Sequence, residues 1–140
     1  GRTRRGLQHH NQRTQSMRLS HIGIEANDIE RLRYWYMRYF AMSSSELYSD
    51  PARGVQCYFL RSSDPSASAL EILHHSDKQS AQPTTAHLAV STGSRQGVDF
   101  LIELLRTDGN TVAREPFVAV NGCYMGVVLD PEGNRVEITE

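Results

Sequence analysis

Hydrophobic and polar residues follow a recognisable order of patterns in the first half of the chain. Residues 19–25, LSHIGIE, alternate as in a half-buried strand, and residues 27–42 carry apolar side chains at helical spacing. Asn27 followed by Glu30 favours a helix start at this point. Three strand-like segments come next, at residues 44–50, 55–62 and 68–75. The pattern predicts a β-α-β-β-β unit over residues 18–75.

The second half repeats this order after a polar segment that contains a proline. A strand-like segment at residues 85–91 precedes a helical pattern at residues 94–109, and Gly109 suits the left-handed residue after a helix. Three more strand-like segments follow, at residues 110–117, 122–130 and 134–140. The repeat predicts an α+β fold of two βαβββ modules in tandem. Their expected bounds are residues 17–76 for module one, 77–84 for the linker and 85–140 for module two.

Charge is distributed unevenly along a chain of otherwise ordinary composition, with 39% apolar and 22% charged residues. Residues 1–16 carry four arginines and no acid, which leaves 11 basic and 16 acidic side chains, a net charge of −5, in residues 17–140. We expect the basic arm to be disordered, as a cloning remnant or an upstream extension before Met17. The acidic body argues against nucleic-acid binding.

Apolar runs and cysteines indicate the compartment. No apolar run approaches the length that crosses a bilayer, so we expect no membrane segment. Cys57 and Cys123 lie in strand-like surroundings without the spacing of metal ligands. Free thiols in a reducing compartment are the simplest interpretation, and we expect a cytoplasmic protein.

Two histidines and two glutamates occupy matched positions in the two modules. His21 lies in the first strand of module one and Glu71 in its last strand, 50 residues later. His87 and Glu137 repeat this placement in module two, again 50 residues apart. A single strand histidine is ordinarily a hydrogen-bonded structural residue, but that explanation does not account for the repeated spacing.

Alternation places all four side chains on one side of their strands. Their immediate neighbours, Ile22, Leu70, Ile72, Leu88, Val136 and Ile138 among them, are mostly apolar and would face the module's helix. Four ionisable groups on the other face are costly to bury without a compensating charge. Two neutral imidazoles and two carboxylates balance a divalent cation, and they suit Zn, Ni, Co, Mn or Fe with positions left open for a substrate oxygen.

The stretches HIGIEANDIERLRYWYMRYFAM, ALEIL, HLAV and LDPEGNRVEI carry a family resemblance over residues 18–140. The sequence resembles the vicinal oxygen chelate superfamily of glyoxalases, bleomycin resistance proteins and extradiol dioxygenases. The resemblance implies two modules whose sheets form an open mixed-sheet barrel around a metal site. It implies the metal ligands His21, Glu71, His87 and Glu137.

One histidine and one glutamate per module is similar to the isomerase, lyase and epimerase branch, typified by glyoxalase I. The resemblance then implies that the metal holds an enediolate or enolate of a small-molecule substrate while Glu137 or Glu71 moves a proton. It also implies a homodimer, in which the four ligands come from one chain or from two.

One position departs from the glutathione-dependent glyoxalases, which typically have an arginine four residues after the first histidine. This chain has Glu25 there, so the charge is reversed and glutathione recognition is not expected.

Three other functions within the superfamily stay open. A metal-free antibiotic-binding protein of the bleomycin-resistance type needs no metal ligands. An extradiol dioxygenase uses two histidines and one carboxylate on Fe(II). A thiol transferase acting on an epoxide antibiotic resembles this chain in size but would leave Glu71 unused.

Some further polar residues have weaker claims to a function. His74 and His75 follow Glu71, and His75 is expected in the linker as a solvated residue. Arg114 and Glu115 precede Pro116 near the expected cavity mouth and could orient an anionic substrate or simply lie on the surface.

Overall fold

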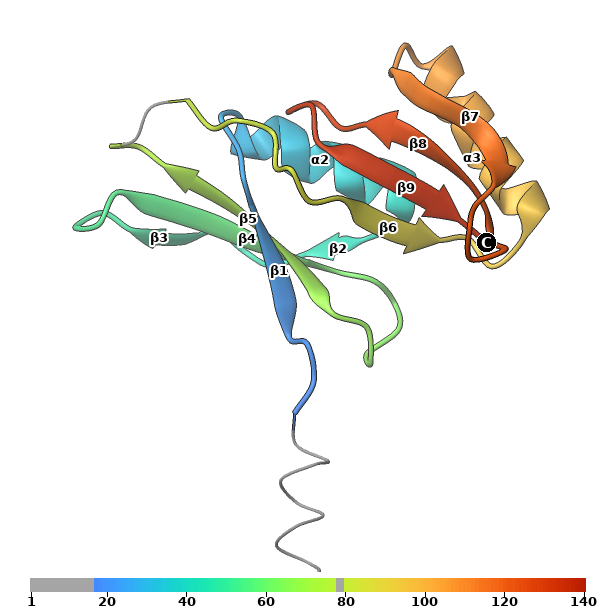
Figure 1. The fold of residues 1–140 in the computed structure, drawn as a ribbon. Helices are drawn as coiled ribbons and strands as arrows, with labels where there is room; N and C mark the ends of the chain where they lie inside the picture. Colours follow the sequence, from blue (N-terminus) through green and yellow to red (C-terminus); the bar gives the residue numbers. More distant parts are fainter. Residues whose placement is uncertain (1–16, 78–79) are drawn as a thin grey trace, which may run out of the picture.

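The computed structural model describes residues 17–77 and 80–140, and these form two modules, each a sheet with one long helix (Figure 1). The basic arm expected at residues 1–16 lies outside the described residues. Residues 78 and 79 of the expected linker also lie outside them.

Module one contains a mixed sheet in which the first and last strands are neighbours. Its elements are β1 (His21–Glu25), α2 (Ile29–Phe40), β2 (Ser43–Ser44), β3 (Tyr48–Asp50), β4 (Val55–Arg61) and β5 (Ala69–His75). The strand order is β1-β5-β4-β2, and β3 also pairs with β4. β1 runs parallel to β5, and the other pairs are antiparallel. The strand expected at residues 44–50 is thus two short strands, both on β4.

Module two repeats this topology. Its elements are β6 (Leu88–Ser91), α3 (Arg95–Thr107), β7 (Val112–Val118), β8 (Tyr124–Leu129) and β9 (Arg135–Thr139). The order is β6-β9-β8-β7, with β6 parallel to β9 and the other pairs antiparallel. The expected α+β fold of two tandem modules is confirmed. The two sheets are open and do not close into a barrel within the described part of the chain.

Local sequence sets the helix ends. The side chain of Asp28, not that of Asn27, caps α2 by accepting from the backbone N–H of Arg31. Asn27 instead binds both backbone groups of Ala81 in the linker. α2 ends at Phe40, and the next residue, Ala41, has a φ of 53° in the left-handed region that favours glycine. Among the described residues, no helix has the length and apolar character needed to span a membrane.

Each helix covers one face of its own sheet. From α2, Leu32 and Tyr36 are fully buried, and from α3, Val98 and Leu105 are. The sheet side of the core is apolar as well, and its fully buried members are Leu60, Ile72, Val128, Val136 and Ile138. The face of each sheet that points away from its helix is left open.

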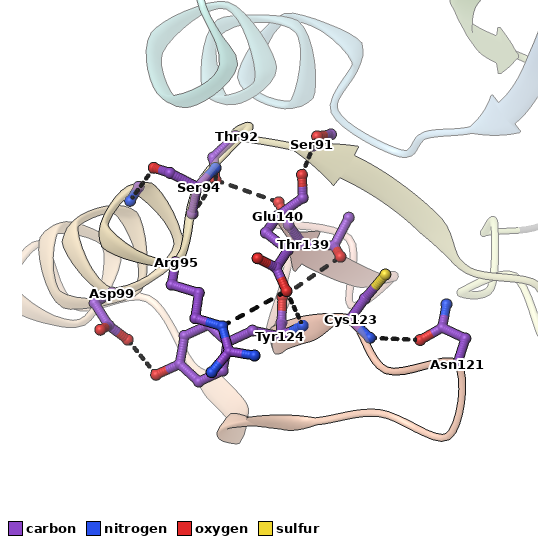
Figure 2. Close-up of polar contacts among 11 residues, drawn as sticks. Ser91, Thr92, Ser94, Arg95, Asp99, Asn121, Cys123, Tyr124, Thr139 and Glu140 are labelled. Atoms are coloured by element: carbon purple, nitrogen blue, oxygen red, sulfur yellow. Dashed lines mark hydrogen bonds and ion pairs between the residues drawn. The ribbon is translucent and has the colours of Figure 1, made fainter.

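Polar contacts at one end of module two tie the central strand β9 to its neighbours (Figure 2). The Glu140 carboxylate accepts from the backbone N–H of Tyr124 at 2.8 Å and pairs with Arg95 at 3.7 Å. The Ser91 hydroxyl donates to the Glu140 carbonyl oxygen, and the Tyr124 hydroxyl donates to Asp99 of α3. These contacts fix β6, β8 and α3 around β9, the strand that carries Glu137.

A buried carboxylate joins the two modules. Asp130 is 4% exposed and accepts from the backbone N–H groups of Glu132 and Asn134 in the β8–β9 turn. The Tyr36 hydroxyl of α2 donates to the other oxygen of Asp130 at 2.7 Å. Burial raises the pKa of Tyr36, and the charge of Asp130 raises it further. α2 therefore packs on its own sheet and is also hydrogen-bonded to module two.

We expect Tyr36→Phe to lower the free energy of unfolding by about 1–3 kcal/mol, because it removes a buried hydrogen bond to a charged group while its ring stays in place. Urea denaturation followed by circular dichroism measures this change. Tyr34→Phe, on the exposed side of α2, is the matched control and should leave stability unchanged. Equal stability of the two variants would mean that the Tyr36–Asp130 hydrogen bond does not stabilise the fold.

Candidate functional site

The parallel pairing of β1 with β5 brings His21 and Glu71 together. His21 pairs with Ala69, and Gly23 pairs with Glu71. Glu71 is therefore a diagonal neighbour of His21 on the adjacent strand and points to the same face of the sheet. The distance from His21 Nε2 to Glu71 Oε1 is 3.9 Å. The first histidine and the first glutamate of the sequence prediction therefore form a pair.

Module two repeats this arrangement. Ala89 of β6 pairs with Glu137 of β9, and His87 directly precedes β6. The distance from His87 Nε2 to Glu137 Oε1 is 3.2 Å. The equal spacing of 50 residues thus corresponds to one register that both modules share.

Both pairs stand on the open faces of their sheets. The side chains of His21 and His87 are 42% and 57% exposed, while those of Glu71 and Glu137 are 18% and 26% exposed. Most of their apolar neighbours face the helices, as expected from alternation. Ile22 is an exception, because it is 43% exposed and lines a cavity that also contains Leu88 and Val90 of β6.

Gly23 leaves room for the carboxylate of Glu71. A Cβ atom at Gly23 would lie 3.3 Å from Glu71 Oε1 and 3.0 Å from a methyl group of Leu73. On the other side, the ring of Phe59 contacts the His21 imidazole edge to face at 5.3 Å. The carboxylate of Glu71 is therefore the more closely packed member of the pair, while the His21 imidazole keeps its exposed side.

Cys57 contacts Glu71 on the same open face. Burial raises the pKa of the Cys57 thiol, and the charge and hydrogen bonding of Glu71 raise it further. The Cys57 thiol is therefore harder to ionise than a solvent-exposed thiol. Cys57 and Cys123 are both free thiols.

The four residues form two pairs, not one cluster, in a single chain. Within residues 17–77 and 80–140, no three His, Cys, Asp or Glu side chains are grouped closely enough to hold a metal ion. Each pair offers one imidazole nitrogen and one carboxylate oxygen, donors that suit a divalent transition metal. Each is thus chemically fitted to be half of a four-ligand site.

The structure corrects the expected position of His75. It is the last residue of β5 and is only 20% exposed, so it does not belong to a solvated linker. Its Nδ1 lies 3.4 Å from Glu25 Oε1, on the same open face as His21 and Glu71. His74 points the other way, and its Nδ1 bonds the carbonyl of Ala26.

Arg114 and Glu115, which the sequence placed together, lie on opposite sides of β7. Glu115 pairs with Arg106 of α3 at 2.7 Å. The Arg114 guanidinium lies over the Phe117 ring, 3.6 Å from its centroid, and lines a cavity of about 460 Å³ that also contains Glu137. Arg135 lines the same cavity. Sequence reasoning missed Arg135. Its position two residues before Glu137 on one strand would have placed it on the same face as Glu137.

Comparison with known families matches most of the chain. The family model described as Glyoxalase/Bleomycin resistance protein/Dioxygenase superfamily matches residues 18–138. No curated protein sequence matches the chain.

Solved structures share the fold at low sequence identity. Glyoxalase I from Leishmania major, described as trypanothione-dependent, is 22% identical with a TM-score of 0.73, over 89% of this chain and 86% of that chain. Lactoylglutathione lyase from Agrobacterium tumefaciens is 16% identical with a TM-score of 0.65, over 88% and 92%. Glyoxalase I from Zea mays is 21% identical with a TM-score of 0.71, over 87% of this chain but 44% of the maize chain.

We expect Glu71→Gln to make Cys57 more reactive in chelator-treated protein. The substitution removes the negative charge that helps to raise the thiol pKa, so more thiolate is present at a given pH below that pKa. Alkylation by iodoacetamide at pH 8, followed by peptide mass spectrometry, should be faster on the order of severalfold, because each pKa unit changes the thiolate fraction about tenfold. Glu137→Gln is the control and should leave Cys57 alkylation unchanged. An unchanged rate in Glu71→Gln would mean that Glu71 does not contact the thiol.

Proposed function

Because the chain belongs to the glyoxalase/bleomycin resistance protein/dioxygenase superfamily, we propose that it is a metal-dependent lyase or isomerase of the glyoxalase I type. Its substrate is a small oxygenated molecule. The observation that carries the proposal is the His–Glu pair repeated in one register on the open face of each sheet.

The proposed metal site lies between two chains of a homodimer. His21 and Glu71 of one chain meet His87 and Glu137 of the other, so that each dimer has two such sites. Three observations support this arrangement: the pairs do not meet within the described part of one chain, both lie on uncovered faces, and both histidines are exposed. The two carboxylates would balance the charge of a divalent cation.

Proton transfer is assigned to Glu137, whereas Glu71 is assigned only to hold the metal. A bound divalent cation would supply Lewis-acid stabilisation of negative charge on a substrate oxygen. Glu137 takes a proton from the carbon beside that oxygen and returns it to the neighbouring carbon, so the reaction needs no oxidant. Glu71 is less suited to this movement because Gly23, Leu73 and Cys57 pack around it, whereas Glu137 is more exposed.

Glutathione conjugates are not the proposed substrates. Glu25 lies on the same open face as His21, four residues further along β1, and it pairs with His75. A carboxylate at this position would repel an anionic peptide group. The substrate is therefore a different small oxygenated molecule.

We expect chelator-treated protein to bind one divalent ion per chain, and His21→Ala and Glu137→Ala each to weaken that binding by more than about 100-fold. The loss should exceed the 10- to 100-fold typical of residues that only support a ligand. Isothermal titration calorimetry with Zn, Ni, Co, Mn and Fe(II) salts, together with elemental analysis, measures this. Glu103→Gln, an exposed glutamate of α3, is the control and should bind as the wild type does.

Two results would overturn the proposal in different ways. Unchanged metal content in both variants would mean that these residues are not ligands. A wild-type protein that binds no metal and retains full ligand binding after chelation would favour the metal-free binding proteins of the superfamily.

A further inference from the structure

The two modules share the His–Glu pair but differ in the side chains beside it. In module one, Glu71 of β5 pairs with Phe59 of β4. Two residues further along β5, Leu73 pairs with Cys57 of β4. In module two, the corresponding row runs from Ala89 through Glu137 and Val127 to Arg114. The row beside Glu71 is therefore apolar at Phe59, whereas the row beside Glu137 ends in the cationic Arg114.

Strand pairing places Arg114 on the face of Glu137. Arg114 pairs with Val127, and Val127 pairs with Glu137, so the three side chains point the same way. Register shifts on both sides of Arg114 allow Phe117, three residues further, to face the same way through its pairing with Met125. The guanidinium rests on the Phe117 ring, which orients its long side chain over the open face.

Arg135 adds a second cation from the central strand. It lies two residues before Glu137 on β9 and therefore shares its face. Among the described residues, neither Arg114 nor Arg135 has a carboxylate within ion-pair distance, although Arg106 and Arg38 each have one. Two guanidiniums thus line the cavity without an ion pair to a described carboxylate, and the carboxylate that lines the cavity with them is Glu137, which is paired with His87.

The cavity combines these charges with an apolar floor. Its lining includes Met125 and Val127, which are 8% and 3% exposed, and the two arginines stand beside Glu137. Neighbouring strands lie about 4.8 Å apart, so the backbone of Arg114 is about 10 Å from that of Glu137, and an arginine side chain can cover much of that distance. An anion held there would lie in the same cavity as the Glu137 carboxylate.

We propose that Arg114 and Arg135 bind an anionic oxygen group of the substrate, a carboxylate or a phosphate. The proposal rests on the proposed function, because it takes Glu137 as the reacting group. The guanidinium fork matches such groups through paired N–H donors. The apolar face of module one, with Phe59 and Leu73, fits the remaining apolar part. The substrate class is an oxygenated small acid with an apolar body.

The test uses full-length protein and three probes: phenylpyruvate, phenyl phosphate and the neutral methyl ester of phenylpyruvate. Binding is measured by calorimetry with and without added metal. We expect the anions to bind at least tenfold more tightly than the ester. Arg114→Gln and Arg135→Gln should each weaken anion binding about tenfold, a loss of one charge-assisted contact. Arg114→Lys should retain part of the affinity for the anions, because it keeps the positive charge. Arg53→Gln, in an exposed turn of module one, is the matched control.

The outcomes separate this proposal from the metal site. Preference for phenylpyruvate identifies a carboxylate substrate, and preference for phenyl phosphate identifies a phosphorylated one. Equal binding of the ester, or unchanged binding in both glutamine variants that keep the wild-type melting temperature, would overturn the arginine proposal. Anion binding that persists in His21→Ala while metal binding is lost would show that the arginines bind the anion without the metal site.

Discussion

The parallel pairing of the first and last strands in each module is the constraint on which the candidate site depends. It sets His21 beside Glu71 and His87 beside Glu137 in one shared register. Because side chains alternate along a strand, a slip of one residue would move each glutamate to the helix-covered face. The buried residues Ile72 and Ile138, which follow the two glutamates, oppose that slip because it would expose them. Core packing therefore holds the polar pairs in place.

The contacts between the modules determine how the pairs are used. Asp130, buried in the β8–β9 turn and bonded by Tyr36, joins α2 to module two. Trp35 adds a bond to Asn110 in the loop after α3. Helix and loops thus form the contact between modules, and both open faces remain uncovered. A chain folded in this way presents two half-sites, which is why we propose that a second chain completes each one.

Residue patterns predicted the strands, the helices and the matched positions of the two histidines and two glutamates, because alternation and a repeated spacing are local or periodic signals. Details set by tertiary contacts could not be predicted. Asp28 caps α2 because Asn27 is bound to the linker, and β5 extends to His75 because β4 continues beside it. The separation of Arg114 from Glu115 depends on the register shifts in β7, and the role of Arg135 depends on which strand lies next to β8. The arrangement of the modules follows from single contacts such as Tyr36 to Asp130.

The most direct test of a site shared between chains is subunit complementation. His21→Ala and His87→Ala chains carrying different affinity tags are co-expressed, and the heterodimer is purified through both tags for metal analysis. If each site combines module one of one chain with module two of the other, this heterodimer has one intact site and binds one metal ion. A heterodimer of wild type with the His21→Ala/His87→Ala double variant should then bind none at high affinity. The reverse result, no metal in the first heterodimer and one ion in the second, would contradict the shared site.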